Sequence, residues 1–171
     1  MNFKVMIKSA GVGLAFFCMV GHAHASNIMV NSAAPFAEGA SVREAVKLEC
    51  QLGTKLPSFI KEFSVKEGVD VELTSNPLDK VKGKALFLEI THVHASGGGA
   101  FSGPKSVSVA GKLLENGKVI SRFTATRYSG GGMFGGFKGT CSIAGRCVKT
   151  LGSDIVKWLK NPVNEAHLGD S

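Results

Sequence analysis

Apolar residues at helical spacing predict two amphipathic helices. The first spans about residues 55–67, with Thr54 as its N-cap and Gly68 at its end. The second spans about residues 142–160 and ends before Pro162. Their apolar stripes are Leu56, Phe59, Ile60 and Phe63 in the first, and Val148, Leu151, Ile155, Trp158 and Leu159 in the second.

Alternation of apolar and polar residues predicts four strands. They are residues 69–74, 85–95, 105–114 and 118–128, of which the last two form a hairpin. The segment 41–49 fits equally a short helix, with a capping box at its start, or a strand. In the longest apolar run of the strands, one face is formed by Leu86, Leu88 and Ile90.

The register of the hairpin depends on the length of its loop. A two-residue turn at Asn-Gly would place Phe123 among polar residues of the facing strand. A three-residue loop, 115–117, pairs Leu113 with Val119 and gathers nearly all the large apolar residues on one face. Because one face must be buried, we expect the longer loop, with Gly117 in the left-handed conformation.

The N-terminus has the three-part pattern of a secretory signal peptide. Two lysines precede an apolar run, residues 10–20, which is about half the length that spans a membrane. Ala23 and Ala25 are the small residues that a signal peptidase reads, so we expect cleavage after Ala25. Cys18 follows two phenylalanines rather than small residues, and we therefore do not expect a lipid anchor there.

The pattern divides the chain into four parts: a cleavable signal peptide (1–25), a mobile lead-in (26–40), a single domain (41–162) and a frayed tail (163–171). The rest of the chain has no second long apolar run, so we expect no transmembrane span in the mature chain. The predicted order of helices and strands is typical of an α+β two-layer sandwich. In it, a mixed or antiparallel sheet of about four strands is packed by two amphipathic helices.

The charge is basic but scattered. The chain has 20 Lys and Arg against 13 Asp and Glu, and two of the lysines lie in the signal, so the mature part carries about +5. Such a charge favours anionic partners in general. Since the lysines form no cluster in the sequence, we expect no nucleic-acid partner, and an anionic ligand or an envelope protein remains open.

Three cysteines remain after the signal, and proteins outside the cytosol usually form disulfides. Cys50 precedes the first helix and Cys141 opens the second, so we expect these two to be bridged at one edge of the sandwich. Cys147 lies on the apolar stripe and is expected to be free and buried. A pairing of Cys141 with Cys147 is possible only if the helix begins later, because six helical residues rise by about 9 Å.

Two histidines form a weak candidate metal site. His92 and His94 are two residues apart on a strand and therefore point to one face, which the alternation assigns to Leu86, Leu88 and Ile90. Two imidazoles could share a metal ion only with a third ligand. The other interpretation is a strand that runs from the core to a polar rim, and we therefore assign no metal and no cofactor.

A glycine-rich loop at residues 130–139 precedes the second helix. Its spacing does not match a phosphate-binding loop, which needs Lys directly after the last Gly and then Ser or Thr. A weaker anion site at the helix N-terminus beside Lys138 remains open. Phe134, Phe137 and Lys138 in this loop are candidates for partner contact, with folding of the rings back onto the core as the alternative. Phe101 lies similarly, beyond a first glycine cluster at residues 97–99.

The plan of a mixed sheet under two helices behind a bacterial-type signal resembles small uncharacterised periplasmic proteins and cell-envelope accessory lipoproteins. The resemblance covers residues 42–162, and the stretch 130–162, with Asp154-Ile155 and Trp158-Leu159, is its most family-like part. It implies a periplasmic or secreted protein. The chain departs from those lipoproteins because it has no usable lipid-attachment motif.

No nucleophile–base pair is evident, so we expect a non-catalytic periplasmic binding or envelope-assembly accessory protein. The alternative is an extracytoplasmic metal-binding protein or enzyme that uses His92 and His94.

Overall fold

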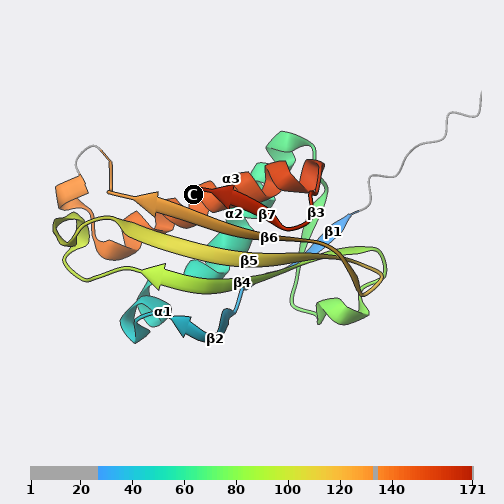
Figure 1. The fold of residues 1–171 in the computed structure, drawn as a ribbon, viewed down its shortest axis with the longest axis horizontal. Coiled ribbons are helices and arrows are strands. Elements are labelled where there is room, and N and C mark those ends of the chain that lie inside the picture. Colours follow the sequence, from blue (N-terminus) through green and yellow to red (C-terminus); the bar gives the residue numbers. More distant parts are fainter. Residues whose placement is uncertain (1–26, 133–134, 171) are drawn as a thin grey trace, which may run out of the picture.

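The computed structural model describes residues 27–132 and 135–170. The predicted signal peptide with its cleavage site, and Phe134, lie outside the described residues. The fold is α+β: a mixed sheet of seven strands has two long helices across one face, while a short third helix lies near one edge (Figure 1).

The strands are β1 (Ile28–Asn31), β2 (Phe36–Ser41), β3 (Val71–Thr74), β4 (Lys84–His94), β5 (Lys105–Glu115), β6 (Lys118–Ser129) and β7 (Ala166–Gly169). The α-helices are α1 (Glu44–Cys50), α2 (Leu52–Glu67) and α3 (Thr140–Lys160), and the 3-10 helices are η1 (Leu78–Lys80), η2 (Gly99–Ser102) and η3 (Gly135–Phe137).

The sheet has an antiparallel centre and parallel flanks. Its order is β3-β1-β4-β5-β6-β7, and β2 pairs with the far half of β4. The long central strands β4, β5 and β6 are antiparallel neighbours, while the short strands β1, β2, β3 and β7 each run parallel to their partners. All four predicted strands are present, but the expected total of about four is wrong.

The three additional strands lie in segments for which the sequence predicted no regular structure. The lead-in 26–40 contains β1 and most of β2, and the tail 163–171 contains β7, so both expectations are wrong. These strands have only four to six residues, and their pairing partners are remote in the sequence, so they leave little local signal. In β1, only Ile28 and Val30 are buried.

The helices begin at unexpected places. Segment 41–49 forms the helix α1 rather than a strand, but Ser41 is the last residue of β2, and the N-cap is Arg43. Helix α2 starts at Leu52, before the expected cap Thr54, which instead donates its hydroxyl to the Gln51 carbonyl at 3.1 Å. The left-handed conformation of Gln51 ends α1 and starts α2, a junction that capping patterns do not show.

The hairpin register differs from both registers considered from the sequence. Asn116 and Gly117 both have positive φ and form a two-residue turn. A bulge at Ile120 then shifts the pairing, so that Leu113 lies opposite Ser121. The bulge achieves what the longer loop was expected to do, because it puts the large apolar residues on the buried face.

Phe123 shows how closely this face is packed. Its ring lies directly over Gly111 on the neighbouring strand, where an added Cβ atom would be 2.2 Å from a ring carbon. The same ring meets Trp158 of α3 edge-on, with centroids 4.8 Å apart. The glycine is therefore required for the contact between sheet and helix.

We predict that Gly111→Ala destabilises the protein by about 1–3 kcal/mol, because the methyl group must displace the Phe123 ring from its place against Trp158. Gly145→Ala is the matched control: it lies in α3 with nothing within 4 Å of its added Cβ, and should be neutral or stabilising by up to about 1 kcal/mol. Denaturant unfolding measures both. Equal stability of the Gly111 variant and the wild type would contradict the packing described here.

Ion pairs of Arg127 attach the C-terminal strand β7 to the rest of the fold, and we call the contacts of Arg127 with Asp154 and Asp170 the arginine latch. Arg127 of β6 binds Asp154 of α3 through Nε at 2.7 Å and a second nitrogen at 3.0 Å, and it also binds Asp170. The Asp170 carboxylate further accepts the Tyr128 amide at 2.9 Å. This backbone hydrogen bond, and then Arg127, lower the pKa of Asp170 below its ordinary 3.8. The arginine latch therefore stabilises β7, whose pairing with β6 is short.

We predict that Asp170→Asn weakens hydrogen-exchange protection in β7 by up to about 1 kcal/mol at neutral pH, because the carboxylate is partly exposed. Since the folded-state pKa is lowered, the stabilisation is present above the ordinary pKa of 3.8 and is lost as the pH falls below it. Wild-type protection in β7 should therefore fall on acidification and the variant should respond less. Asp79→Asn, an exposed site on η1, is the control; an equal effect there would contradict the latch.

Candidate functional site

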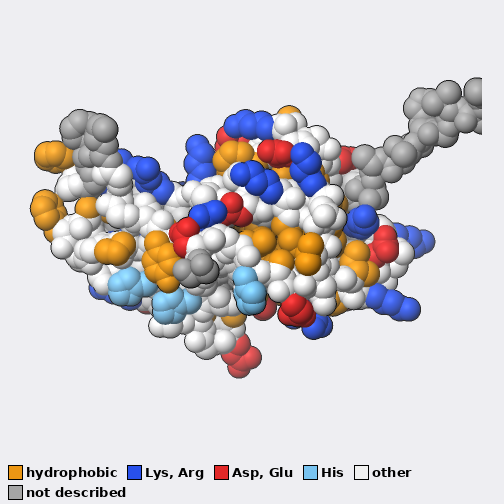
Figure 2. Space-filling view, turned by 45° about the horizontal axis from the view of Figure 1, so that its top comes forward, with side chains coloured by type: hydrophobic (Ala, Val, Ile, Leu, Met, Phe, Trp, Pro, Cys, Tyr) orange, Lys and Arg blue, Asp and Glu red, His pale blue; other side chains and the backbone are white. Residues whose placement is uncertain are grey.

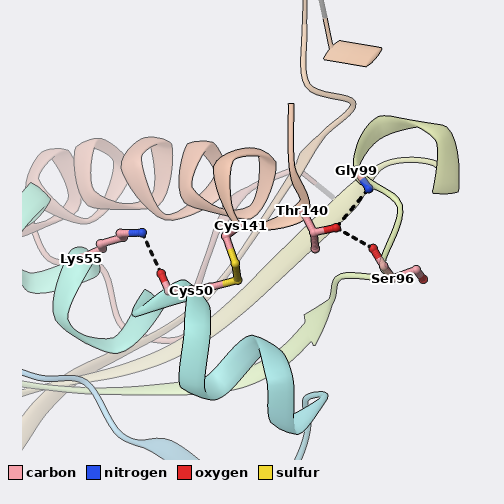
Figure 3. Close-up of a disulfide and its surroundings, with 6 residues drawn as sticks. All are labelled: Cys50, Lys55, Ser96, Gly99, Thr140 and Cys141. Carbon is pink, nitrogen blue, oxygen red and sulfur yellow. Dashed lines mark hydrogen bonds between the residues drawn. A yellow bond between two sulfur atoms is a disulfide. The ribbon is translucent and has the colours of Figure 1, made fainter. Parts of the chain in front are cut away.

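The disulfide expected from the sequence is present. Cys50, the last residue of α1, is bridged to Cys141 in the first turn of α3, with Cα atoms 4.8 Å apart (Figure 3). Lys55 of α2 donates to the Cys50 carbonyl at 2.8 Å. The bridge therefore fixes the start of α3 against the α1–α2 junction.

The remaining described cysteine, Cys147, is free and buried, also as expected. Its thiol lies 3.5 Å from the Lys105 carbonyl and 3.8 Å from that of Ile143. Burial raises the pKa of this thiol to about 11, so at neutral pH it is almost entirely protonated and a poor nucleophile.

Thr140, next to the bridge, holds the loop that follows β4. Its hydroxyl donates to the Ser96 carbonyl at 3.0 Å and accepts the Gly99 amide at 3.2 Å (Figure 3). Gly99 has positive φ, and a Cβ there would be 2.3 Å from the Lys138 carbonyl. The loop carrying η2 thus lies directly against the segment that enters α3.

A buried lysine supports the same loop from inside. Lys105 is fully buried, and its ammonium donates to the Ser102 hydroxyl at 2.7 Å and to the Gly103 carbonyl at 2.8 Å. The Ser102 hydroxyl also reaches the carbonyls of Gly99 and Ser96, at 3.0 and 3.3 Å. A buried ammonium is costly unless it is hydrogen-bonded, so these contacts strongly favour one loop conformation. The burial of Lys105 is not predictable from the sequence, because a lysine at the start of a strand resembles a solvent-exposed charge.

Two phenylalanines project from this end of the molecule, and we call them, with η2 and η3, the aromatic tip. Phe101 on η2 is 88% exposed and Phe137 on η3 is 92% exposed. The two short helices adjoin, since a Cβ on Gly136 would lie 3.6 Å from the Phe101 ring. Hydrophobic side chains protrude at this end in Figure 2. The sequence marked Phe137 as a candidate for partner contact and placed Phe101 similarly, beyond the first glycine cluster.

A hollow with three cations lies beside the tip on the outer surface of α3. This basic hollow, of ≈ 490 Å³, is lined by Lys138, Ser142, Arg146, Lys149 and Thr150. Two of its cations converge on one acceptor, because Lys138 and Arg146 each donate to the Gly131 carbonyl at 2.9 Å. None of these lining residues is acidic.

Neighbouring groups moderate this charge only in part. Lys149 also lies 5.7 Å from the Phe59 ring centroid, on the side of α2. There Glu62 is already paired with Lys66 at 3.0 Å, and its pKa is lowered mainly by Lys66 and only slightly by Lys149. The basic hollow can therefore accept an anion.

The histidine pair does not lie where the alternation placed it. Pairing of β4 with β5 shifts between Ile90 and His92, so a bulge at Thr91 reverses the alternation. Val93 consequently enters the core, while His92 and His94 are exposed on the opposite face. The expectation that they share the face of Ile90 is wrong.

His92 and His94 lack a metal-binding context in the described structure. Their partners on β5 are Ser108 and Ser106, and no group of three His, Cys, Asp or Glu residues that could hold a metal ion occurs within residues 27–132 and 135–170. Two imidazoles and serine hydroxyls do not form a typical zinc site. No observation therefore favours the metal-dependent alternative.

Over the same residues, no helix has both the length and the apolar character needed to cross a membrane.

No protein-family model and no curated protein sequence matches the chain. Among solved structures, it is similar to the PelC dodecamer from Paraburkholderia phytofirmans, with 19% identity and a TM-score of 0.48 over 85% of this chain and 93% of that one. It is also similar to protein XCC0632 of the DUF330 family from Xanthomonas campestris, with 13% identity and a TM-score of 0.47 over 79% and 83% of the two chains. The function is therefore inferred from the aromatic tip and the basic hollow.

Proposed function

We propose that the chain is a non-catalytic accessory protein of the bacterial cell envelope that docks on its partner through the aromatic tip. The observation that supports this most is Phe101, which is 88% exposed on a loop held by a buried lysine and a threonine. Exposed aromatic residues on a rigid scaffold are typical of interaction sites.

The energetics of the loop favour an interaction role over a structural one. Ordering a residue costs about 1–2 kcal/mol, and burying a phenylalanine contributes about 1.5–3 kcal/mol. With Phe101 and Phe137 in water, the free protein gains almost none of that burial energy. Hydrogen bonds nevertheless hold the loop that carries Phe101, because Lys105 donates to the Gly103 carbonyl and Thr140 accepts the Gly99 amide. The rings can therefore contribute their burial energy when a partner covers them.

The proposed location rests on two features of the chain. A disulfide between Cys50 and Cys141 is characteristic of an oxidising compartment. Residues 1–25 have the pattern of a secretory signal. A periplasmic or secreted protein has both.

We predict that a photoreactive phenylalanine analogue at position 101 or 137 forms adducts in the intact cell envelope, because the partner covers both rings. Leu48 and Val65, exposed by 73% and 72% on other surfaces, are the control positions. In-cell cross-linking followed by mass analysis identifies each adduct as protein or lipid. Equal labelling at the control positions, or none at the tip, would contradict the proposal.

The double variant Phe101→Ala/Phe137→Ala tests whether the rings serve the fold instead. Because both rings are exposed, the melting temperature should change by less than about 2 °C. A drop of many degrees would show that the rings are part of the core.

A further inference from the structure

We propose that the aromatic tip and the basic hollow together form a docking surface for a membrane rich in anionic phospholipid. Phe101 and Phe137 insert at the boundary between headgroups and acyl chains, and the basic hollow binds a lipid phosphate. This inference rests on the proposed function and names the partner of the same tip.

The arrangement of side chains matches the chemistry of such a surface. Two phenylalanines exposed by 88% and 92% stand at the end of the molecule, and the basic hollow begins at Lys138, the residue after Phe137. Interfacial proteins combine inserted aromatic rings with flanking cations in this way. A single ring or a single cation would bind only weakly, whereas both together add apolar and electrostatic contributions.

The segments that form the tip and the hollow have few acidic residues, which favours an anionic surface over a neutral one; Glu49 of α1 is an acidic residue that lines a pocket with Gly97 and Thr140. Between residues 91 and 153, which include η2, η3 and the hollow, the sequence contains a single acidic residue, Glu115. Glu115 ends β5 at the hairpin turn, whereas η2 precedes the opposite end of that strand. Arg146 and Lys149 are exposed on α3, one turn apart, and therefore face the same side.

The polar groups that line the hollow also suit a phosphate. Ser142 contributes a hydroxyl beside the three cations, whereas Thr150 donates its hydroxyl proton to the Arg146 carbonyl at 3.1 Å. Phosphate oxygens accept charge-assisted hydrogen bonds from such groups. A lipid headgroup and free phosphate share this chemistry. Only a lipid offers acyl chains to the two phenylalanine rings, so insertion of the rings distinguishes the two ligands.

Binding of the disulfide-bonded chain to vesicles tests the proposal. The probes are vesicles of phosphatidylcholine alone and of phosphatidylcholine mixed with phosphatidylglycerol, measured by co-sedimentation. We expect binding to the mixed vesicles that weakens with added salt. Each of Phe101→Ala and Phe137→Ala should reduce the affinity by about tenfold. Lys149→Gln should reduce it by about fivefold, whereas Lys157→Gln, exposed near the other end of α3, should have much less effect.

A tryptophan reporter separates insertion from surface adsorption. In Phe137→Trp the new indole should shift its emission to shorter wavelength on the mixed vesicles and be quenched by brominated acyl chains. The native Trp158 is only 6% exposed and gives a constant background. Wild-type vesicle binding checks that the substitution itself does not create the affinity.

Three results would overturn the inference. They are no binding to the mixed vesicles, binding without quenching of the reporter, and binding of inorganic phosphate in the hollow with no affinity for vesicles. Protein adducts from photoreactive residues at the tip, together with no vesicle binding, would replace the membrane by a protein partner and leave the proposed function intact. Absence of any adduct at the tip would contradict both the proposed function and the membrane inference.

Discussion

The start of α3 is the constraint on which the functional end of the molecule depends. The Cys50–Cys141 bridge fixes the first turn of this helix to α1, and Thr140 next to it bonds the loop that carries η2. From there the helix runs across the sheet, where Trp158 meets Phe123. The bridge and Thr140 thereby hold the loop that carries Phe101 against the start of α3. The bridge joins residues 91 positions apart in the sequence, and closing so long a loop stabilises the fold by about 4.6 kcal/mol on the chain-entropy model.

Much of the core could be predicted because its signal is local. The apolar stripe of α3 and the alternation in β4, β5 and β6 gave the correct helices and strands, and the stripe position of Cys147 gave its burial. The pairing of Cys50 with Cys141 followed from their places at two helix starts. What failed depends on contacts between remote segments, since β1, β2 and β7 are strands only through their neighbours.

Two β-bulges explain why the predicted side-chain directions in β4 and the predicted hairpin register were wrong. At Thr91 an extra residue reverses the alternation of β4 and exposes His92 and His94. At Ile120 an extra residue reverses the alternation of β6, so that Phe123 is buried although the turn has only two residues. Bulges have no reliable sequence signal, because they are selected by packing on both sides of the strand. The same limit applies to Lys105, whose burial depends on Ser102 and Gly103 folding over it. Phe101 could be noticed as an aromatic residue beyond the Gly97–Gly99 cluster, but its exposure depends on the fold of the loop and was not decided by the sequence.

The central claim is that the free protein holds Phe101 outward on an ordered loop. Hydrogen exchange at the amides of Gly99, Phe101 and Gly103 tests it most directly, because these amides bond to Thr140, Gly98 and Ala100. The account predicts measurable protection at all three in the absence of any partner, and its loss in Thr140→Ala at Gly99. Exchange at the rate of an unstructured peptide in the disulfide-bonded wild type would contradict it.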